Sequence, residues 1–423
     1  MRNMVRLLII ADDFTGALDT GVQFAVSGAA TLVETERDID YCAVEPGIKV
    51  LVMDAETRHL DAKEAYRIVA RAVADARRAG VPYIYKKTDS ALRGNIGAEL
   101  KALYDISEGK RVHFIPALPK MNRITKNGIH YIEGVPVGES IFGKDPFEPV
   151  LASSVKEIIG RQSEVPVCLM KNSEVEGNGS RGILVYDTET DEQMTEIAKK
   201  LFVQNELGYC AGCAGFASVL PELLGLKGMP GSLPKLSPKL FVACGSMNPI
   251  TVSQLDHAER SGVPRIRLNV EQKLSKDWPE SGEADSCARN WKRLCMNRGV
   301  CILDSNDEEG DDRTSRYMKE KGINLEQARK SIASNIGSMV KRLLDDGLEA
   351  TLLITGGDTL KGFLEKVGIS RLQPVCEVTP GTVISEFRYQ DRIYHVISKS
   401  GGFGKESLIG DLLKRMTQEK ETI

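Results

Sequence analysis

Residues 5–20 of the chain, VRLLIIADDFTGALDT, carry the pattern that decides the fold. An unbroken apolar run ends at two aspartates, and small and polar residues then lead into a helical stretch. A near-continuous apolar run is typical of a strand that is covered on both faces, as in a parallel sheet. No small-residue cleavage site follows the run, so we interpret it as a first β-strand and not as a signal peptide.

The same alternation of strand and helix continues through the first half of the chain. Helical periodicity over residues 62–80 places alanines, valines and an isoleucine on one side, and the pattern stops at Gly80 and Pro82. Alternation of this kind argues for a parallel α/β sheet. Further apolar runs that predict strands lie at residues 48–55, 82–87, 111–117 and 182–188.

A stretch without periodicity, residues 225–238, interrupts the pattern with prolines and glycines and is interpreted as a linker. The alternation then resumes with apolar runs at 239–246, 350–355 and 392–398. We therefore predict two α/β domains, residues 1–224 and 239–423, with largely parallel sheets. Ligands of open α/β sheets bind beyond the carboxyl ends of the strands, so we expect the two domains to face each other across a cleft.

Composition excludes several classes of protein. The 423 residues carry 56 Lys and Arg against 59 Asp and Glu, a net charge of -3, which gives no electrostatic case for binding nucleic acid or an anionic membrane. No apolar run approaches the roughly 18 residues of a membrane-spanning helix. The nine cysteines are scattered and odd in number, which favours a reduced, cytoplasmic protein. Cys210 and Cys213 form a C-x-x-C pair without nearby partners for zinc, so we expect packing residues.

Three small-residue turns follow strands in the second half. They are Gly245-Ser246, the run from Gly356 and Gly357 to Asp358 and Thr359, and the run that holds Gly401 and Gly402. Glycine turns before a helix expose backbone N–H groups and so favour phosphate, although each alone could be an ordinary strand–helix turn. The last turn fails the P-loop pattern because Glu406 follows Lys405. It also departs from the dinucleotide fingerprint, because Ser407 stands in place of the third glycine, which disfavours a Rossmann dehydrogenase. We predict a nucleotide phosphate site.

Charged and hydroxyl side chains follow strands in the first half. Asp12 and Asp13 end the first apolar run, and either could cap a helix, bind a substrate hydroxyl or act as a general base. Arg58 follows another strand and is a candidate carboxylate ligand, or a solvated residue. After residues 82–87, one short loop combines cations, an acid and hydroxyls, which suits a polyhydroxy acid better than a simple helix cap. Its candidate residues are Lys87, Thr88, Asp89, Ser90, Arg93 and Asn95.

A pocket for an anionic polyol, together with turns that bind phosphate, suggests phosphoryl transfer from ATP. This reaction depends on alignment of the reactants and on charge neutralisation, usually with Mg²⁺. Asp12, Asp13 and Asp89 compete for the role of base, and Lys87 and Arg58 would hold the acid or neutralise the phosphoryl charge. Two alternatives remain open on the residues alone. One is an NAD-dependent hydroxy-acid dehydrogenase, and the other is a two-lobed binding protein for sugar acids.

Six runs, in order along nearly the whole chain, resemble the four-carbon acid sugar kinase family. They are IADDFTGALDTG at 10–21, YKKTDSALRGNIGAEL at 85–100, PALPKMNRITKNGIHYIEGVPV at 116–137, CGSMNPITVSQL at 244–255, ITGGDT at 354–359 and ISKSGGFG at 397–404. The third run departs from the family, which commonly has Gly-Arg-Thr where Asn122-Arg123-Ile124 precede Thr125 here.

The resemblance implies an N-terminal domain that binds the sugar acid and a C-terminal domain that binds ATP. The reaction it implies is phosphorylation of the terminal hydroxyl of threonate, erythronate or 3-oxo-tetronate. The run ALDTGVQFA favours D-threonate. By the same resemblance, the Asp12–Asp13 pair, Arg58 and the 87–90 stretch contact the acid, whereas Ser246, the 356–359 turn and Gly402 contact ATP. Enzymes of this size are often symmetric dimers, so a homodimer is the assembly to test.

Overall fold

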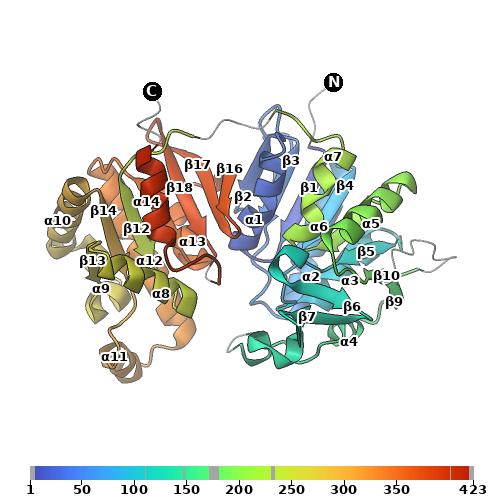
Figure 1. Cartoon of the computed structure of the whole chain (residues 1–423), viewed down its shortest axis with the longest axis horizontal. Coiled ribbons are helices and arrows are strands. Elements are labelled where there is room, and N and C mark those ends of the chain that lie inside the picture. The colour runs from blue at the N-terminus through green and yellow to red at the C-terminus, as the bar shows by residue number, and fades with distance from the viewer. Residues whose placement is uncertain are drawn as a thin grey trace. The chain divides into compact units, whose positions relative to one another are not determined.

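The computed structural model describes residues 5–109, 111–145, 148–170, 181–229, 234–400 and 402–418. The chain divides into two compact units, Met1–Gly231 and Ser232–Ile423 (Figure 1). Both are α/β units with largely parallel sheets, as the alternation of apolar runs and helices predicted. None of the described helices is both long and apolar enough to cross a membrane.

The sheet of the first unit is parallel, and its strands run in the order β2-β3-β1-β4-β11-β5-β10-β9. The central strands are apolar on both faces, because helices cover both sides. The strands are β1 (Leu7–Ala11), β2 (Thr31–Glu34), β3 (Val50–Asp54), β4 (Tyr83–Lys87), β5 (Val112–Ile115), β9 (Val167–Met170), β10 (Ile183–Tyr186) and β11 (Tyr209–Gly212).

Four helices of the first unit, α1, α2, α4 and α5, begin at side-chain caps that the sequence supplies. Asp13 accepts a hydrogen bond from Gly16 N at the start of α1, and Asp61 caps α2 in the same way. One face of the sheet packs against α2, α3 and α4 through a continuous apolar core. The helices are α1 (Phe14–Ala25), α2 (Ala62–Arg78), α3 (Ile96–Ile106), α4 (Val155–Gly160), α5 (Asp191–Val203), α6 (Ala214–Ser218) and α7 (Leu220–Leu223).

A small antiparallel sheet leaves the main sheet after β5. Its strands are β6 (Arg123–Lys126), β7 (Ile129–Ile132) and β8 (Val135–Pro136). The β6–β7 turn places Asn127 and Gly128 at φ values of 51° and 73°, the left-handed pair that closes tight hairpins. Single turns of 3-10 helix flank it, namely η1 (Pro119–Met121), η2 (Val137–Glu139) and η3 (Ile141–Lys144).

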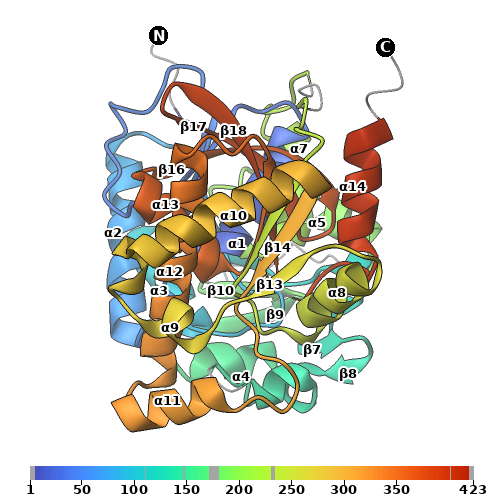
Figure 2. The same cartoon turned by 90° about the vertical axis from the view of Figure 1, so that its left-hand side faces the viewer.

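The sheet of the second unit is parallel over β13-β14-β12-β15-β18 and continues with the antiparallel strands β17 and β16. Helices α8 and α14 cover one face, whereas α10, α12 and α13 cover the other (Figures 1 and 2). The strands are β12 (Leu240–Cys244), β13 (Arg265–Arg267), β14 (Val300–Asp304), β15 (Thr351–Thr355), β16 (Arg371–Thr379), β17 (Thr382–Tyr389) and β18 (Arg392–Lys399).

Helices of the second unit include two with complete capping boxes, at Asn269 and Asn324. The region 271–320 forms short helices, the long α10 and strand β14. The helices are α8 (Pro249–Arg260), α9 (Val270–Leu274), η4 (Trp278–Glu280), α10 (Gly282–Arg298), α11 (Arg313–Lys321), α12 (Leu325–Asp345), α13 (Gly357–Val367) and α14 (Leu408–Gln418).

Candidate active site

The parallel register of the first unit brings the carboxyl ends of its central strands to one edge. Ala11 pairs with Asp54 on one side and with Lys87 on the other, and Lys87 pairs in turn with Gly212. The loops that follow these strands therefore start side by side. This edge gathers the acid-binding candidates that are far apart in the sequence.

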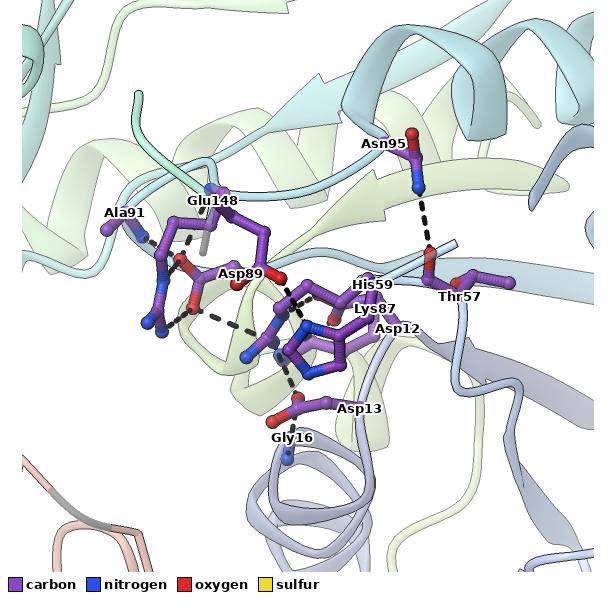
Figure 3. A network of polar contacts seen from close by, with 12 residues as sticks. Asp12, Asp13, Gly16, Thr57, His59, Lys87, Asp89, Ala91, Asn95 and Glu148 are labelled. Carbon is purple, nitrogen blue, oxygen red and sulfur yellow. Dashed lines mark hydrogen bonds and ion pairs between the residues drawn. The ribbon is translucent and has the colours of Figure 1, made fainter. Parts of the chain in front are cut away.

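Arg58 contacts three aspartates. Two of them, Asp12 and Asp13, lie at the start of α1, and Asp89 lies in the loop after β4 (Figure 3). Its Nε donates to Oδ2 of Asp12 at 2.7 Å, and its Nη2 lies 2.7 Å from Oδ1 of Asp13 and 3.7 Å from Oδ1 of Asp89. The Arg58 backbone N–H also donates to the carbonyl of Asp12 at 3.2 Å. Because β1 ends at Ala11, strand alternation does not separate the two aspartates, and both contact the same guanidinium.

Electrostatics keep this cluster ionised. Burial raises the pKa of Asp13 and of Asp89, but attraction to the nearby cations outweighs it, so the Asp13 pKa is lowered and that of Asp89 lies well below its usual value. Arg58 and Lys87 act on Asp13, whereas Arg93 and Arg58 act on Asp89. Burial lowers the pKa of Arg58, and the three aspartates raise it well above its usual value despite that. Asp13, Asp89 and Arg58 are therefore charged at neutral pH.

Lys87 extends from the end of β4 toward the start of α1. Its Nζ lies 3.9 Å from Oδ1 of Asp12, too far for a hydrogen bond, so among the described residues the ammonium protons remain available to a ligand. Gly16 makes room for this arrangement. A Cβ at Gly16 would lie 2.4 Å from Oδ1 of Asp13 and 2.6 Å from Nζ of Lys87.

The loop after β4 is held by its own ion pairs. Arg93 donates to Asp89 from Nε at 2.9 Å and from Nη2 at 3.1 Å, and its Nη1 donates to Asp145 at 3.2 Å. Arg93, a predicted acid ligand, is thus already engaged by two carboxylates. Thr88 is fully buried, and no described residue hydrogen-bonds its Oγ1. Ser90 accepts a hydrogen bond from Arg123.

A buried ion pair below the site was missed by the sequence analysis. Lys86 and Glu99 have no exposed side-chain surface, and Nζ lies 3.0 Å from Oε2. Lys86 Nζ also donates to the Lys87 carbonyl at 2.6 Å, and Thr57 donates to Glu99. The pair therefore supports both Lys87 and the loop that carries Arg58. Consecutive lysines in a buried strand were the available signal, since they must point to opposite faces.

Asn95 supports the backbone next to Arg58 through its side-chain amide. Its side-chain amide donates to the carbonyls of Thr57 and Leu60, both at 2.8 Å, and the residue is buried. These bonds fix the turn next to Arg58. Cys210 and Cys213 are also buried, and burial raises the pKa of both thiols, so they are poor nucleophiles and metal ligands.

The second unit brings its glycine turns together in the same way. Cys244, Asp304, Thr355 and Lys399 end neighbouring strands in register, and Gly245-Ser246 and Gly356 follow two of them. A Cβ on Gly245 would lie 2.0 Å from Oγ1 of Thr359, so the two turns touch.

Gly356 has φ 98° and ψ 126°, a conformation that favours glycine, and no side chain caps α13. The α13 N-terminus thus keeps N–H groups for an anion. Gly357 is the first residue of that helix, and Gly402 lies beside Asn248, whose Nδ2 is 3.9 Å from its ideal Cβ position. Gly401 lies outside the described residues.

Lys399 adds a buried cation near these turns. It is 1% exposed, and Nζ donates to Oγ1 of Thr251 at 2.9 Å and to the carbonyl of Ser400 at 3.1 Å. Burial lowers its pKa to about 8. Ser246 is positioned through its carbonyl, which accepts from Asn306 at 3.1 Å. The turns are therefore tied to the surrounding helices and loops.

No preformed metal cage occurs in the part of the chain that the structure describes, since no three or more His, Cys, Asp or Glu side chains are grouped to hold an ion. Mg²⁺ in phosphoryl-transfer enzymes is commonly held by one or two carboxylates together with the phosphates. Asp358 is a carboxylate that could serve in this way. It lies in the first turn of α13, 3.4 Å from Nε of Arg329. The residues fit a nucleotide-borne Mg²⁺ with few protein ligands.

Comparison with solved structures shows the same fold. A Salmonella typhimurium LT2 protein superposes with a TM-score of 0.79 at 20% identity, over 98% of this chain and 99% of that chain. A Haemophilus influenzae protein gives a TM-score of 0.73 at 20% identity, over 95% and 98% of the two chains.

Comparison with sequences gives the family. A D-threonate kinase of Salmonella typhimurium is 29% identical, over 97% of this chain and 98% of that protein. A D-erythronate kinase of Heliobacterium modesticaldum is 25% identical over 89% of each. A 3-oxo-tetronate kinase of Methylobacterium radiotolerans is 23% identical over 96% and 98%. Residues 7–220 match the sugar-binding N-terminal domain family, and residues 241–409 match the nucleotide-binding C-terminal domain family. The chain belongs to the four-carbon acid sugar kinase family.

Proposed function

We propose that the protein transfers the γ-phosphoryl group of ATP to the C4 hydroxyl of a four-carbon sugar acid, with D-threonate as its substrate. The observation that carries the proposal is the Arg58 cluster with Lys87 beside it, at the carboxyl edge of the N-terminal sheet. Fixed carboxylates suit hydroxyl groups, and an ammonium with unused protons suits an acid. Family membership and 29% identity to a D-threonate kinase support the same reaction.

The contacts of each residue suggest its role in the reaction. Lys87 binds the carboxylate of the acid or the transferring phosphoryl group, since its protons are not used within the cluster. Arg58 holds the three aspartates in place and helps to keep Asp13 and Asp89 ionised. The N-terminal unit would bind the acid, and the glycine turns at 245–246, 356–359 and 401–402 would bind the ATP phosphates through backbone N–H groups. Mg²⁺ bound to ATP would neutralise charge that develops on the phosphate oxygens.

Asp13 is the best-placed acceptor for the proton of the attacking hydroxyl. Its side chain is 20% exposed, against 2% for Asp12 and 9% for Asp89, so a ligand can reach it. Asp89 is held in a two-bond contact by Arg93 and has the more strongly lowered pKa, so it is the weaker base. Asp12 and Asp89 then act as fixed anions that orient Arg58 and Arg93.

A stereoisomer screen tests the activity. ADP release is measured with ATP and D-threonate, L-threonate, D-erythronate or 3-oxo-tetronate, with and without Mg²⁺, and the product is identified by phosphorus NMR. We expect a 4-phosphate, Mg²⁺ dependence and the highest kcat/KM for D-threonate. A higher kcat/KM for D-erythronate or 3-oxo-tetronate would reassign the substrate. If none of the four acids led to ADP release, the kinase proposal would be refuted.

The two alternative activities separate in the same experiment. The dehydrogenase alternative has no support among the relatives, and it requires a change in NADH absorbance without ADP release. A binding protein would show thermal stabilisation by an acid with no consumption of ATP. We also propose a cytoplasmic homodimer, on the grounds of cysteine content and chain size, and sedimentation of the purified protein measures the assembly.

A further inference from the structure

Residues 119–145, which we call the arm, contact the loop after β4 from outside the main sheet. This loop, residues 88–95, is called the acid-binding loop below. The arm comprises η1, the small β6–β8 sheet, η2 and η3. His130 Nε2 lies 2.9 Å from the carbonyl oxygen of Ser90, and Arg123 Nη1 donates to the Ser90 hydroxyl. At its other end, Asp145 accepts from Arg93 at 3.2 Å. The arm therefore holds the loop at both Ser90 and Arg93.

The ring of Phe142 is shared by two arginines of this contact. The guanidinium carbon of Arg93 lies 5.2 Å from the ring centroid, and that of Arg123 lies 5.3 Å from it. Each distance is within the range of a cation–π interaction. Arg93 is neutralised by Asp89 and Asp145, which limits repulsion between the two cations. Phe142 thus fixes the position of Arg123 relative to Ser90.

The hydrogen bond from Arg123 decides what the Ser90 hydroxyl can do. A guanidinium has donors and no acceptor, so Ser90 Oγ must accept, and its own proton stays free to be donated. Among the described residues, none accepts a hydrogen bond from that proton. Ser90 is half-buried, so a ligand in the acid-binding loop can reach it. Arg123 makes Ser90 a donor toward the ligand.

We propose that Arg123, held by Phe142, is a positioning residue that fixes Ser90 as a hydrogen-bond donor and thereby selects the hydroxyl configuration of the sugar acid. The inference rests on the proposed kinase function. An acid that places an oxygen lone pair opposite Ser90 satisfies its proton. A diastereomer with that hydroxyl turned away leaves a half-buried donor unsatisfied, and sites of this kind discriminate strongly between such substrates.

The test measures the ratio of kcat/KM for D-threonate to that for D-erythronate. Arg123→Gln removes the guanidinium with its charge and its paired N–H donors, and Phe142→Leu removes the aromatic ring. Both should lower the ratio roughly three- to tenfold, the contribution of about one hydrogen bond. Phe142→Trp keeps an aromatic face and should restore the ratio. Ile141→Ala is the matched control, because Ile141 neighbours Phe142 in η3 and is 78% exposed.

A double-variant cycle separates positioning from a general structural role. If Arg123 acts through Ser90, then Arg123→Gln should change the ratio in the wild-type background and leave it unchanged in Ser90→Ala. Equal changes in both backgrounds, or unchanged ratios in Arg123→Gln and Phe142→Leu, would overturn the inference. Where a variant is inactive, calorimetric dissociation constants for the two acids replace kcat/KM. A wild-type enzyme that phosphorylates no four-carbon acid would instead refute the proposed function.

Discussion

Arg58 donates from Nε to Oδ2 of Asp12 at 2.7 Å, and the two side chains are 9% and 2% exposed. An ion pair as buried as this one is held between loops that follow different strands. Removing one partner leaves the other charge buried and uncompensated, which costs about 3–5 kcal/mol in proteins. We therefore expect the pair to contribute both to the stability of the fold and to the reaction, so that its loss lowers the free energy of unfolding and the turnover.

Arg58→Ala is expected to lower the free energy of unfolding by about 3 kcal/mol or more and to reduce kcat/KM for the acid by at least roughly 100-fold. The reason is that Asp12, Asp13 and Asp89 lose their shared cation. Urea unfolding and ADP release measure the two effects. Arg71→Ala is the control, because Arg71 is 67% exposed and its ion pairs are solvated. Wild-type activity in Arg58→Ala would remove this cluster from the active site.

Gly356→Ala tests the nucleotide turn. Alanine at φ 98° is strained by about 1–3 kcal/mol, and the turn beside Ser246 should shift. We expect a higher KM for ATP with little change in KM for the acid. Gly368→Ala is matched to it, because Gly368 ends the same helix at φ 69° with open space around its Cβ position. If the two variants bind ATP equally well, the 356–359 turn does not hold the nucleotide.

His130 should make stability depend on pH. Burial lowers its pKa from 6.5 to about 4 in the folded protein. Between these values the unfolded chain takes up a proton that the folded chain does not, so stability is complete above pH 6.5 and falls toward pH 4. The shift corresponds to about 3 kcal/mol.

The measurement is urea unfolding at several pH values between 4.5 and 7.5. His130→Gln should be less sensitive to pH in this window than the wild type. Buried His113 also has a pKa lowered by burial, so part of the dependence should persist in His130→Gln. Identical slopes for His130→Gln and the wild type would contradict the assignment.

The buried Lys86–Glu99 pair predicts non-additive stability. Glu99→Leu alone leaves the ammonium of Lys86 uncompensated and should cost about 3–5 kcal/mol. Lys86→Met combined with Glu99→Leu removes both charges and should recover much of that loss. Thermal unfolding of the wild type, Glu99→Leu, Lys86→Met and the double variant measures these differences in stability. A double variant less stable than either single variant would show that the pair contributes mainly through hydrogen bonds and not through charge compensation.

The main sheets and the position of the site follow from the sequence for a simple reason. Strands buried on both faces are largely apolar, so the polar residues at the end of each run mark the carboxyl end of a parallel strand. This rule found Asp12, Lys87 and the Gly356 turn. It missed the β6–β8 sheet, whose strands are short and only partly apolar. Asn127-Gly128 was the local signal for its hairpin.

Partners of the charged residues could not be predicted in the same way. The sequence made Arg58 a candidate ligand of the acid, and it gave no sign that Arg58 also contacts three aspartates of the protein itself. Nor did it show that the Asn95 amide donates to two backbone carbonyls. Which charges meet depends on how loops fold over the sheet edge, and no periodicity in the sequence encodes that.

The two adjacent lysines of β4 also help to fix the register of this strand against its neighbours. In the native alignment, Lys87 faces the aspartates and Lys86 faces Glu99. Sliding β4 by one residue in one direction would place Tyr85 opposite Glu99, and in the other direction it would place Thr88 beside the aspartates. Either shift leaves a buried carboxylate without the lysine that faces it in the native sheet. Misaligned forms of the sheet are therefore unfavourable, and only the native alignment pairs both lysines with carboxylates.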